Sequence, residues 1–354
     1  MILLGSTGSI GVNALNIARE FDLDVEVLVA GNSIELLNKQ IKEFKPKIVV
    51  VKDKDSIYKV DHDRVLYGEE GILDAILQSS SSLLVNSLVG FAGLKPTIKA
   101  IECGKRVALA NKESLVVAGQ FIDMSKITPI DSEHFGLWYL LDSDKKISKM
   151  TITASGGSFR DAPIDSLKNA TVDDALNHPN WSMGKKITID SATMTNKLFE
   201  LLEAKWLFDI DDLDAIIETK SIIHAMINFA DGSTTAHIAG TDMRLPIAYA
   251  ILGRVDNEIL KPIDLSKVGS LEFREIDPLR YPIWEIKDDI LKNPHLGVVV
   301  NSANEVAIDR FFSGKISFLD ISKYTLKAYK EFHDFKPNSL EDIYLIDKEI
   351  RNFF

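Results

Sequence analysis

Apolar and polar residues follow two alternating patterns along the first 118 residues of the chain. Short, unbroken apolar runs recur at intervals, at Met1–Leu4, Val25–Ala30, Ile48–Val51, Leu83–Asn86 and Arg106–Ala110. Stretches whose apolar residues have helical spacing lie between these runs, for example Val12–Glu20, Glu35–Phe44 and Gly71–Gln78. Apolar strands that alternate with helices are typical of a parallel sheet covered by helices on both faces.

The pattern changes after residue 118. Three segments have the alternation of strands, namely Lys149–Ala154, Ser221–Phe229 and Thr234–Ile238, and a helix is expected over Thr193–Phe208. The tail from Pro282 is helical in character, most clearly over 302–312 and 321–332. We therefore predict an α/β fold with a parallel-sheet domain over 1–120, an α+β domain over 121–253, a linker over 254–280 and a helical domain over 281–354.

Composition narrows the class of protein. The 354 residues are 45% hydrophobic and 26% charged, as in ordinary globular proteins, and the net charge of −11 argues against a nucleic-acid partner. The single cysteine, Cys103, cannot form an internal disulfide, and the apolar runs are too short to cross a membrane. No signal-peptide pattern precedes the first strand. We expect a cytoplasmic protein that binds neither nucleic acid nor membrane.

A glycine loop follows the first strand and opens a helix. Gly5, Gly8 and Gly11 allow the backbone to turn sharply and to approach a pyrophosphate closely, while the helix amino terminus offers free amides. Thr7 and Ser9 add hydroxyl donors. The loop predicts a dinucleotide-binding, Rossmann-type first domain; a glycine-rich structural turn is the alternative.

The end of the second strand indicates which dinucleotide is bound. NAD-selective folds usually place an acidic residue there to bind the ribose 2′-hydroxyl. Gly31, Asn32 and Ser33 occupy that position and carry no negative charge. This favours NADPH over NAD, although the loop contains no lysine or arginine to pair with the 2′-phosphate.

Acidic residues at two places can hold a metal. Asp131 and Glu133 lie two apart where a strand meets a helix, so their side chains point the same way in extended backbone. Asn196 and Glu200 share a face of the helix that follows cap candidates Asp190 and Ser191. Carboxylates suit a hard divalent cation. The alternatives are an acidic helix start and a solvated charged helix face.

Three further segments can bind anions or cover a site. Two glycines beside Ser155 in ASGGSF (154–159) allow amides to surround an anion, although a hairpin turn explains them equally. HPNWSMG (178–184), expected before another strand, suits a lid or a loop that buries Trp181. Residues 111–113 follow a strand at the edge where ligands bind in open α/β sheets.

Together these segments resemble the 1-deoxy-D-xylulose 5-phosphate reductoisomerases, NADPH-dependent enzymes of the non-mevalonate isoprenoid pathway. The matching segments, in order from residue 5 to residue 307, are GSTGSIG, ALANKESLV, PIDSEH, ASGGSFRD, HPNWSMGKKITIDSATMTNKLFELLEAKWLF, SIIHAMINFADGS and VVNSANEVA. The resemblance covers nearly the whole chain, and the block over 178–208 is long and specific. It implies a homodimer, a phosphorylated sugar as substrate and a catalytic role for residues 121–253.

The resemblance also implies the site residues. The residues implied to bind the cofactor are Thr7, Gly8, Ser9, Ile10, Gly31, Asn32, Ser33, Asn111, Glu113 and Gly184. The residues implied to bind the substrate are Lys112, Ser132, Glu133, Ser155, His178, Ser191, Asn196, Lys197 and Glu200. The implied metal ligands are Asp131, Glu133 and Glu200, for Mg, Mn or Co. The implied catalytic groups are Lys112, Glu133, His178, Lys197 and Glu200. Trp181 and Met183 belong to the implied closing loop, and His224 is a supporting position.

The chain departs from the family pattern at Asn32, where a lysine is common, and at Leu198, where a small residue is common. The implied reaction is metal-assisted rearrangement by retro-aldol cleavage and aldol rejoining, followed by hydride transfer from NADPH to give 2-C-methyl-D-erythritol 4-phosphate. Two alternatives are an NADP-linked semialdehyde dehydrogenase, for which Cys103 is the one candidate nucleophile, and a non-catalytic NADPH sensor.

Overall fold

The computed structural model describes residues 1–141 and 145–354, which form two compact units. Unit 1 consists of Met1–Ser114, Asp123–Asp131 and Asp242–Leu260. Unit 2 consists of Leu115–Ile122, Ser132–Thr241 and Lys261–Phe354. Within the described ranges, no helix is both long and apolar enough to cross a membrane. The domain boundaries predicted from the sequence stay a prediction.

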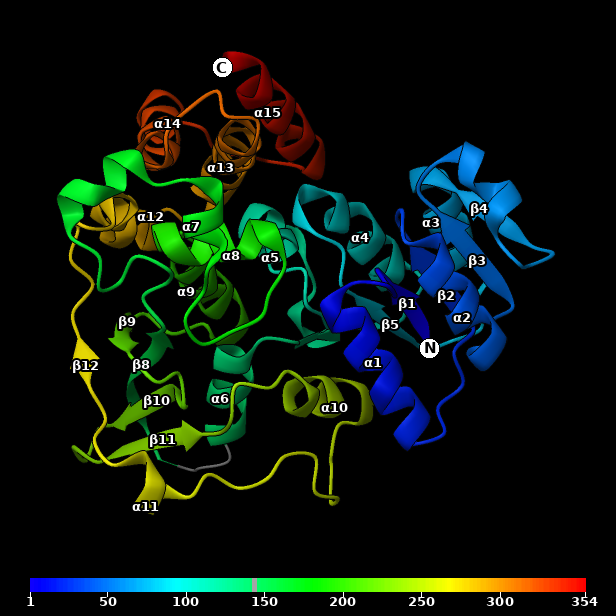
Figure 1. The fold of residues 1–354 in the computed structure, drawn as a ribbon, viewed down its shortest axis with the longest axis horizontal. Helices are drawn as coiled ribbons and strands as arrows, with labels where there is room; N and C mark the ends of the chain where they lie inside the picture. Colours follow the sequence, from blue (N-terminus) through cyan, green and yellow to red (C-terminus); the bar gives the residue numbers. More distant parts are fainter. Residues whose placement is uncertain (142–144) are drawn as a thin grey trace. The chain divides into compact units, whose positions relative to one another are not determined.

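Unit 1 is built on a parallel sheet of seven strands in the order β4-β3-β2-β1-β5-β6-β7 (Figure 1). The strands are β1 (Ile2–Leu4), β2 (Val27–Ala30), β3 (Ile48–Val51), β4 (Val65–Tyr67), β5 (Leu83–Asn86), β6 (Arg106–Leu109) and β7 (Ile127–Pro129). Five of them were predicted as apolar runs. The strand order reverses at β1, which pairs with β2 on one side and β5 on the other. Ligands bind at the carboxyl ends of strands at such a reversal.

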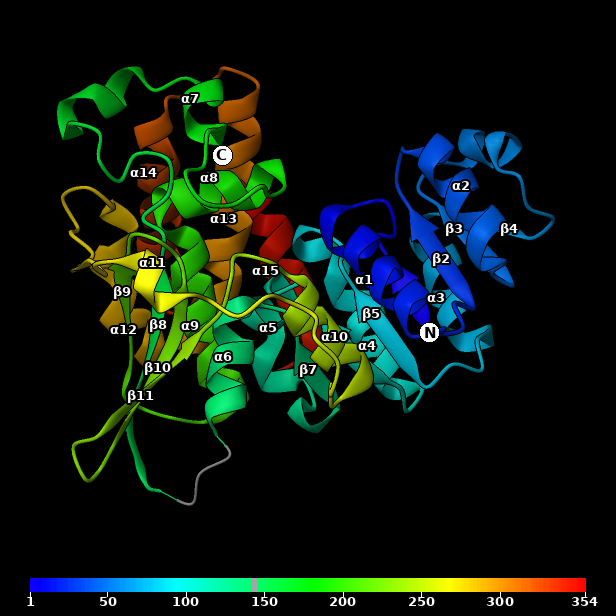
Figure 2. The ribbon, with the colours of Figure 1, turned by 60° about the horizontal axis from the view of Figure 1, so that its bottom comes forward.

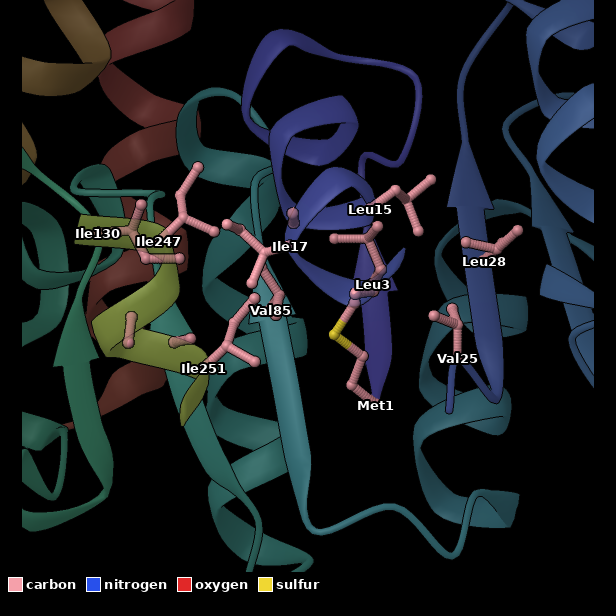
Figure 3. Packing of buried hydrophobic residues seen from close by; sticks show 14 of the residues in the cluster. Met1, Leu3, Leu15, Ile17, Val25, Leu28, Val85, Ile130, Ile247 and Ile251 are labelled. Atoms are coloured by element: carbon pink, nitrogen blue, oxygen red, sulfur yellow. The ribbon is translucent and has the colours of Figure 1, made fainter. Parts of the chain in front are cut away.

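Helices cover both faces of this sheet. They are α1 (Ser9–Glu20), α2 (Ile34–Phe44), α3 (Gly68–Gln78), α4 (Leu94–Glu102) and α10 (Arg244–Leu252). Short 3-10 turns complete the unit at η1 (Lys54–Lys59), η2 (Gly90–Gly93) and η4 (Met124–Lys126). Side chains of α1, α2 and α10 pack with β1, β2 and β3 into one buried apolar cluster, of which Figure 3 shows Leu3, Leu15, Leu28 and Ile247. Each fully buried side chain of this kind contributes about 1.5–3 kcal/mol.

Helix α10 comes from a distant part of the sequence. Arg106, at the start of β6, donates hydrogen bonds to the carbonyl oxygens of Ala250 and Ile251 at 2.7 and 2.8 Å. These bonds satisfy carbonyl groups at the carboxyl end of α10, which have no partner within the helix. Together with the buried contacts of α10, they attach residues 242–260 to unit 1.

Glu26 is a buried carboxylate at the amino end of β2. It accepts hydrogen bonds from Ser79 Oγ at 2.7 Å and the Ser81 amide at 2.9 Å, and Lys47 Nζ lies 3.1 Å away. Burial alone would raise the pKa of Glu26, but these hydrogen bonds lower it to about 2. Because the unfolded pKa is near 4.5, the carboxylate stabilises unit 1 fully above that pH, and this contribution is lost as the pH falls toward 2.

We expect Glu26→Gln to destabilise unit 1 by roughly 2 kcal/mol at neutral pH, because buried donors would lose a charged acceptor. The same change at Glu43, whose ion pair with Arg19 is exposed, should cost less than about 1 kcal/mol. Amide hydrogen exchange in β2 and β5 measures both effects. The deficit of the Glu26 variant should shrink at about pH 3; a deficit independent of pH would contradict this account of the carboxylate.

Unit 2 contains a mixed sheet of five strands in the order β11-β10-β8-β9-β12. The strands are β8 (Ile147–Ala154), β9 (Leu213–Glu218), β10 (Ile223–Phe229), β11 (Thr234–Ile238) and β12 (Phe273–Arg274). Only β8 and β9 pair in parallel. Helix α6 lies close to the sheet at Gly136, where a Cβ would be 2.9 Å from the Ala225 side chain. The edge strand β12 arises within residues 254–280, which the sequence predicted as a linker.

The helices of the remaining chain are α5 (Glu113–Ala118), α6 (Ser132–Leu140), α7 (Val172–Leu176), α8 (Lys185–Thr193), α9 (Thr195–Phe208), α11 (Leu265–Val268), α12 (Lys287–Lys292), α13 (Gly297–Phe312), α14 (Phe318–Glu331) and α15 (Leu340–Phe353). Short 3-10 turns occur at η3 (Gly119–Phe121), η5 (Ile164–Asn169), η6 (Pro282–Ile286) and η7 (Pro294–Leu296). Figure 2 shows α13 and α14 beside the segment that carries α8. Ile189 of α8 packs there in a cluster with Phe311 and Phe318. The predicted fold class, a parallel-sheet domain with an α+β part and a helical tail, is confirmed.

The segment before α9 differs from the prediction. A strand followed by a helix capped at Asp190 or Ser191 was expected, but these residues lie in α8, and α8 and α9 meet at Met194 with φ +69°. The isoleucines at 187 and 189 have a strand-like alternation. In the folded protein this segment is helical, and Ile189 packs in the cluster of α8, α13 and α14. Tertiary contacts of this kind readily override the weak strand preference of β-branched residues.

Candidate functional site

The glycine loop joins β1 to α1 at the carboxyl edge of the parallel sheet. Gly5 has φ +80°, and a Cβ on Gly11 would lie 2.2 Å from the Gly5 carbonyl oxygen, so both positions require glycine. The exposed Gly8 precedes the first turn of α1 and has no side chain to cap it. The first amides of α1 and the positive end of its dipole are therefore available to a pyrophosphate.

Gln40 of α2 supports this loop from the interior. Its Nε2 donates to the carbonyl oxygen of Ser6 at 2.8 Å, and both residues are buried. The Gly5 and Ser6 amides also donate to the Val29 carbonyl oxygen, each at 2.9 Å. The loop is thus held in shape on the side away from solvent. Sequence reasoning missed Gln40; its signal was a polar residue beside the buried Leu37 on α2.

Two other predicted cofactor segments lie at the same sheet edge. Residues 31–33 are exposed directly after β2. Asn111 follows β6 and is buried, where its amide donates to the carbonyl oxygens of Leu88 and Gly90 at 2.9 and 2.8 Å. Asn111 therefore holds the loop that follows β5, and its direct contact with a cofactor stays a prediction, as does that of Glu113.

Three carboxylates converge where β7 leads into α6. Asp131, Glu133 and Glu200 can each present an oxygen such that these oxygens all lie within 4.8 Å of one another. Asp131 and Glu133 are separated only by Ser132, the first residue of α6, and Glu200 comes from α9. The structure thus brings together the residues predicted as metal ligands. Their all-oxygen donor set fits a hard divalent cation such as magnesium or manganese.

Two buried lysines pair with these carboxylates. Lys112 Nζ lies 2.8 Å from Asp131 Oδ2, and Lys197 Nζ lies 3.0 Å from Glu133 Oε1 and also pairs with Glu200. Within unit 2, the carboxylates of Glu133 and Glu200 and the ammonium of Lys197 together carry one net negative charge, and all three side chains are largely buried. Buried charges of one sign are costly without compensation, so a divalent cation is accommodated here electrostatically as well as geometrically.

A second layer connects the helices that carry the acids. His134 Nε2 lies 2.8 Å from the Glu200 carbonyl oxygen, and its Nδ1 lies 3.2 Å from Glu203 Oε2. Both His134 and Glu203 are almost fully buried. The imidazole therefore links α6 to α9 directly behind Glu133 and Glu200. Sequence reasoning missed both residues, although each lies within three positions of a predicted ligand.

Ser155, His178 and Ser191 come together from the loop after β8, the segment after α7 and the last turn of α8. His178 Nε2 lies 2.8 Å from Ser155 Oγ and 3.3 Å from Ser191 Oγ. The loop after β8 approaches α8 closely at Gly157, where a Cβ would be 2.6 Å from the Ser191 carbonyl oxygen. The structure thus brings together three residues predicted to bind substrate. Two hydroxyls and an imidazole N–H are suitable donors to a phosphate.

The protonation state of His178 follows from its surroundings. Its Nδ1 accepts hydrogen bonds from the amides of Asn180 and Trp181 at 3.1 and 3.0 Å, which leaves the proton on Nε2. Burial, and then the positive charge of Arg160, lower the pKa of His178 to about 4. The ring is therefore neutral at pH 7 and presents Nε2–H toward the two serines. Arg160, which sequence reasoning missed, also donates to the Ser155 carbonyl oxygen at 2.8 Å.

The C-terminal helices support this part of the site. Asn304 of α13 donates to Asp190 Oδ1 at 2.6 Å, and Lys186 Nζ lies 2.9 Å from Asp190 Oδ2. All three belong to unit 2, and Asn304 and Asp190 are buried. Asp190 immediately precedes Ser191, so this network fixes the turn of α8 that presents the serine.

The loop over 178–184 contains the predicted lid residues. The ring of Trp181 lies 6.1 Å from that of His224 with an edge-on inclination of 62°. His224 is buried on β10, and its Nε2 lies 3.2 Å from the Ala239 carbonyl oxygen. Gly184 ends the loop as the residue before α8, and its contact with a cofactor stays a prediction. Asn196 lies beside Glu200 on α9, to which its amide donates.

Comparison with known proteins identifies a family over most of the chain. The family model described as 1-deoxy-D-xylulose 5-phosphate reductoisomerase matches residues 1–119. The model of that family's C-terminal domain matches residues 127–208, and the model described as DXP reductoisomerase C-terminal domain matches residues 238–353.

Relatives and solved structures agree with these matches. The chain is 62% identical over 360 residues to the 1-deoxy-D-xylulose 5-phosphate reductoisomerase of Nautilia profundicola, covering 100% of this chain and 98% of that one. It is 52% identical to the enzyme of that name from Wolinella succinogenes, covering 100% and 99%. A DOX-P reductoisomerase solved with NADPH, fosmidomycin and magnesium is similar with a TM-score of 0.92 at 33% identity, covering 99% and 96%. The Zymomonas mobilis enzyme solved with NADPH gives 0.87 at 33% identity, also covering 99% and 96%.

Proposed function

Because the chain belongs to the 1-deoxy-D-xylulose 5-phosphate reductoisomerase family, it is an NADPH-linked enzyme of isoprenoid biosynthesis, and we propose which of its residues carry the reaction. The observation on which the proposal depends is the convergence of Asp131, Glu133 and Glu200 beside two buried lysines. The proposed product is 2-C-methyl-D-erythritol 4-phosphate.

The glycine loop is proposed to hold the cofactor pyrophosphate. Support comes from the required glycines, the exposed Gly8 and the free amides at the start of α1. Thr7, Ser9 and Ile10 complete this contact, while Gly31, Asn32 and Ser33 face the adenosine ribose. NADPH supplies the hydride when it is bound. The chain's part is to fix the dinucleotide, and the bonds of Gln40 and Val29 to the loop keep its shape.

The carboxylates of Asp131, Glu133 and Glu200 are proposed to hold the divalent ion. The bound ion would polarise the carbonyl and hydroxyl oxygens of the substrate as a Lewis acid. Lys112 and Lys197 are placed to donate hydrogen bonds to these substrate oxygens and to compensate charge that develops on them. Ser132 and Asn196, each beside a carboxylate of the group, position the substrate's hydroxyl end.

The opposite end of the substrate carries a phosphate. We propose that Ser155, His178 and Ser191 donate to it, with His178 acting as a neutral donor through Nε2. Ser191 lies on α8, and Glu200 lies on α9, the next helix along the chain. Anchoring the phosphate at Ser191 therefore fixes the distance of the reacting carbons from the carboxylate group. Closure of the loop that contains Trp181 and Met183 would exclude water from the intermediate.

The alternative of a semialdehyde dehydrogenase requires a cysteine beside the cofactor. Cys103 follows α4 and precedes the amino end of β6, whereas the glycine loop follows the carboxyl end of β1 in the same parallel sheet. Cys103 therefore lies at the wrong edge for that chemistry. A non-catalytic NADPH sensor would not need the carboxylates and lysines. The homodimer, the cytoplasmic location and the choice among magnesium, manganese and cobalt stay predictions.

The test is oxidation of NADPH, followed by absorbance, with 1-deoxy-D-xylulose 5-phosphate as substrate. We expect oxidation that requires both this substrate and a divalent metal, and that stops when a chelator is added. Oxidation with an aldehyde substrate in the presence of chelator would instead support the dehydrogenase. Binding of NADPH without oxidation under any condition would support the sensor.

A further inference from the structure

The loop predicted to face the 2′-phosphate of NADPH lacks a cation. Gly31, Asn32 and Ser33 offer amides, one side-chain amide and one hydroxyl, but no positive charge. A phosphate monoester is held most strongly by charged donors, since hydrogen bonds between ionised groups are about twice as strong as neutral ones. A cation from another segment of unit 1 would supply the stronger contact. This inference rests on the proposed function.

The register of the parallel sheet places the end of β3 beside the 31–33 loop. Strands β2 and β3 pair in parallel with Ala30 opposite Val51 at their carboxyl ends. Gly31 is the residue directly after β2, and Lys52 is the residue directly after β3. Neighbouring strands lie about 4.8 Å apart, so the backbone of Lys52 emerges beside the first residue of the 31–33 loop.

The chemistry of Lys52 suits this position. Lys52 is exposed, and the structure assigns it no ion pair within the described ranges. Lys54, two residues later, has its ammonium 5.8 Å from the centre of the Tyr67 ring and so is directed toward β4. The flexible four-carbon stem of a lysine lets its ammonium reach a phosphate from a neighbouring strand as a point charge.

We propose that Lys52 supplies the cation that binds the 2′-phosphate of NADPH and thereby sets the preference for NADPH over NADH. Asn32 and Ser33 complete the contact as neutral donors. Two acidic residues lie close to the loop in the chain, Glu35 in the first turn of α2 and Asp53 after Lys52. Their negative charges would repel a phosphate at this edge if no cation were present. A lysine at position 52 compensates for that repulsion.

The test compares Lys52→Gln with Lys54→Gln, a matched control that removes one charge from the same segment. Binding of NADPH and of NADH to the protein without substrate is followed by nicotinamide fluorescence. We expect Lys52→Gln to weaken NADPH binding by roughly 10- to 100-fold and to leave NADH binding nearly unchanged. Lys54→Gln should retain the preference for NADPH. Adding Asn32→Lys to the Lys52→Gln variant should restore it, because a lysine then enters the loop itself.

The outcomes separate this inference from the proposed function. If the unchanged protein prefers NADPH and Lys52→Gln keeps the same ratio of NADPH to NADH affinity, then Lys52 does not bind the 2′-phosphate, while the proposed function stands. If both variants lose affinity equally, the effect is general electrostatics and the assignment to Lys52 is overturned. If the unchanged protein binds no NADPH, the proposed function itself fails.

Discussion

Glu200→Gln is expected to abolish metal-dependent oxidation of NADPH, with a fall in kcat of roughly 10³-fold or more, because several kcal/mol of Lewis-acid stabilisation depend on the ion. Glutamine has the shape of glutamate but lacks its charge. The substitution would present an amide to Lys197 where a carboxylate now pairs with it, and would leave only Asp131 and Glu133 as anionic ligands. The affinity for the metal should fall together with the activity.

Three measurements isolate the role of Glu200. Activity is measured at saturating substrate over a range of metal concentrations, binding of Mn²⁺ by electron paramagnetic resonance, and folding by thermal unfolding. Glu331→Gln, an exposed position on α14, serves as the matched control and should behave as the unchanged protein. Full activity of Glu200→Gln at ordinary metal concentration would remove Glu200 from the metal site.

Gly8→Asp is expected to weaken binding of NADPH by about 100-fold. A carboxylate about 5 Å from a phosphate charge costs roughly 3 kcal/mol at an effective dielectric constant of 20. The change should be tolerated by the fold, because a Cβ on Gly8 would be 3.4 Å from its nearest neighbour, the Gly5 carbonyl oxygen, and Gly8 has φ −79°. Gly11 would not serve for this test, because any side chain there would collide with the loop backbone.

Gly8→Asn is the matched control, since asparagine adds the same bulk without the charge. The ratio of the two dissociation constants for NADPH measures electrostatic repulsion, and the loss shared by both variants measures steric exclusion of the pyrophosphate. We expect the aspartate variant to bind at least about tenfold more weakly than the asparagine variant. Equal affinity of both variants and of the unchanged protein would show that the pyrophosphate binds elsewhere.

The parallel sheet could be predicted because its strands are buried on both faces. Runs such as Ile48–Val51 are apolar throughout, and glycines or helical spacing mark their ends. Strands β4, β9 and β12 were missed; β4 and β12 have three and two residues, which are too few to show a period. The place of α10 in unit 1 could not be predicted, because it depends on contacts between residues more than 100 positions apart, such as Arg106 with Ala250.

The site residues also fall into those that a local sequence pattern indicates and those that depend on contacts between distant segments. Ligand types at short spacing, such as Asp131 and Glu133, are visible in the sequence, and the family resemblance connected them to Glu200. The residues that support these ligands from the interior could not be predicted from the sequence. His134, Glu203 and Asn304 act through backbone carbonyls and buried partners from other helices, and no local pattern distinguishes them from ordinary core residues. Lys52 is of the same kind, because only the strand register places it beside the 31–33 loop.

One protein is expected both to rearrange the carbon skeleton of 1-deoxy-D-xylulose 5-phosphate and to reduce it with NADPH at a metal-dependent site. The most direct measurement is the amount and identity of the product, determined by nuclear magnetic resonance and mass spectrometry, for each equivalent of deuterated NADPH oxidised. We expect one equivalent of singly deuterated 2-C-methyl-D-erythritol 4-phosphate with divalent metal present, and no product with chelator. Oxidation of NADPH that yields an unbranched sugar alcohol, or that persists in chelator, would contradict this expectation.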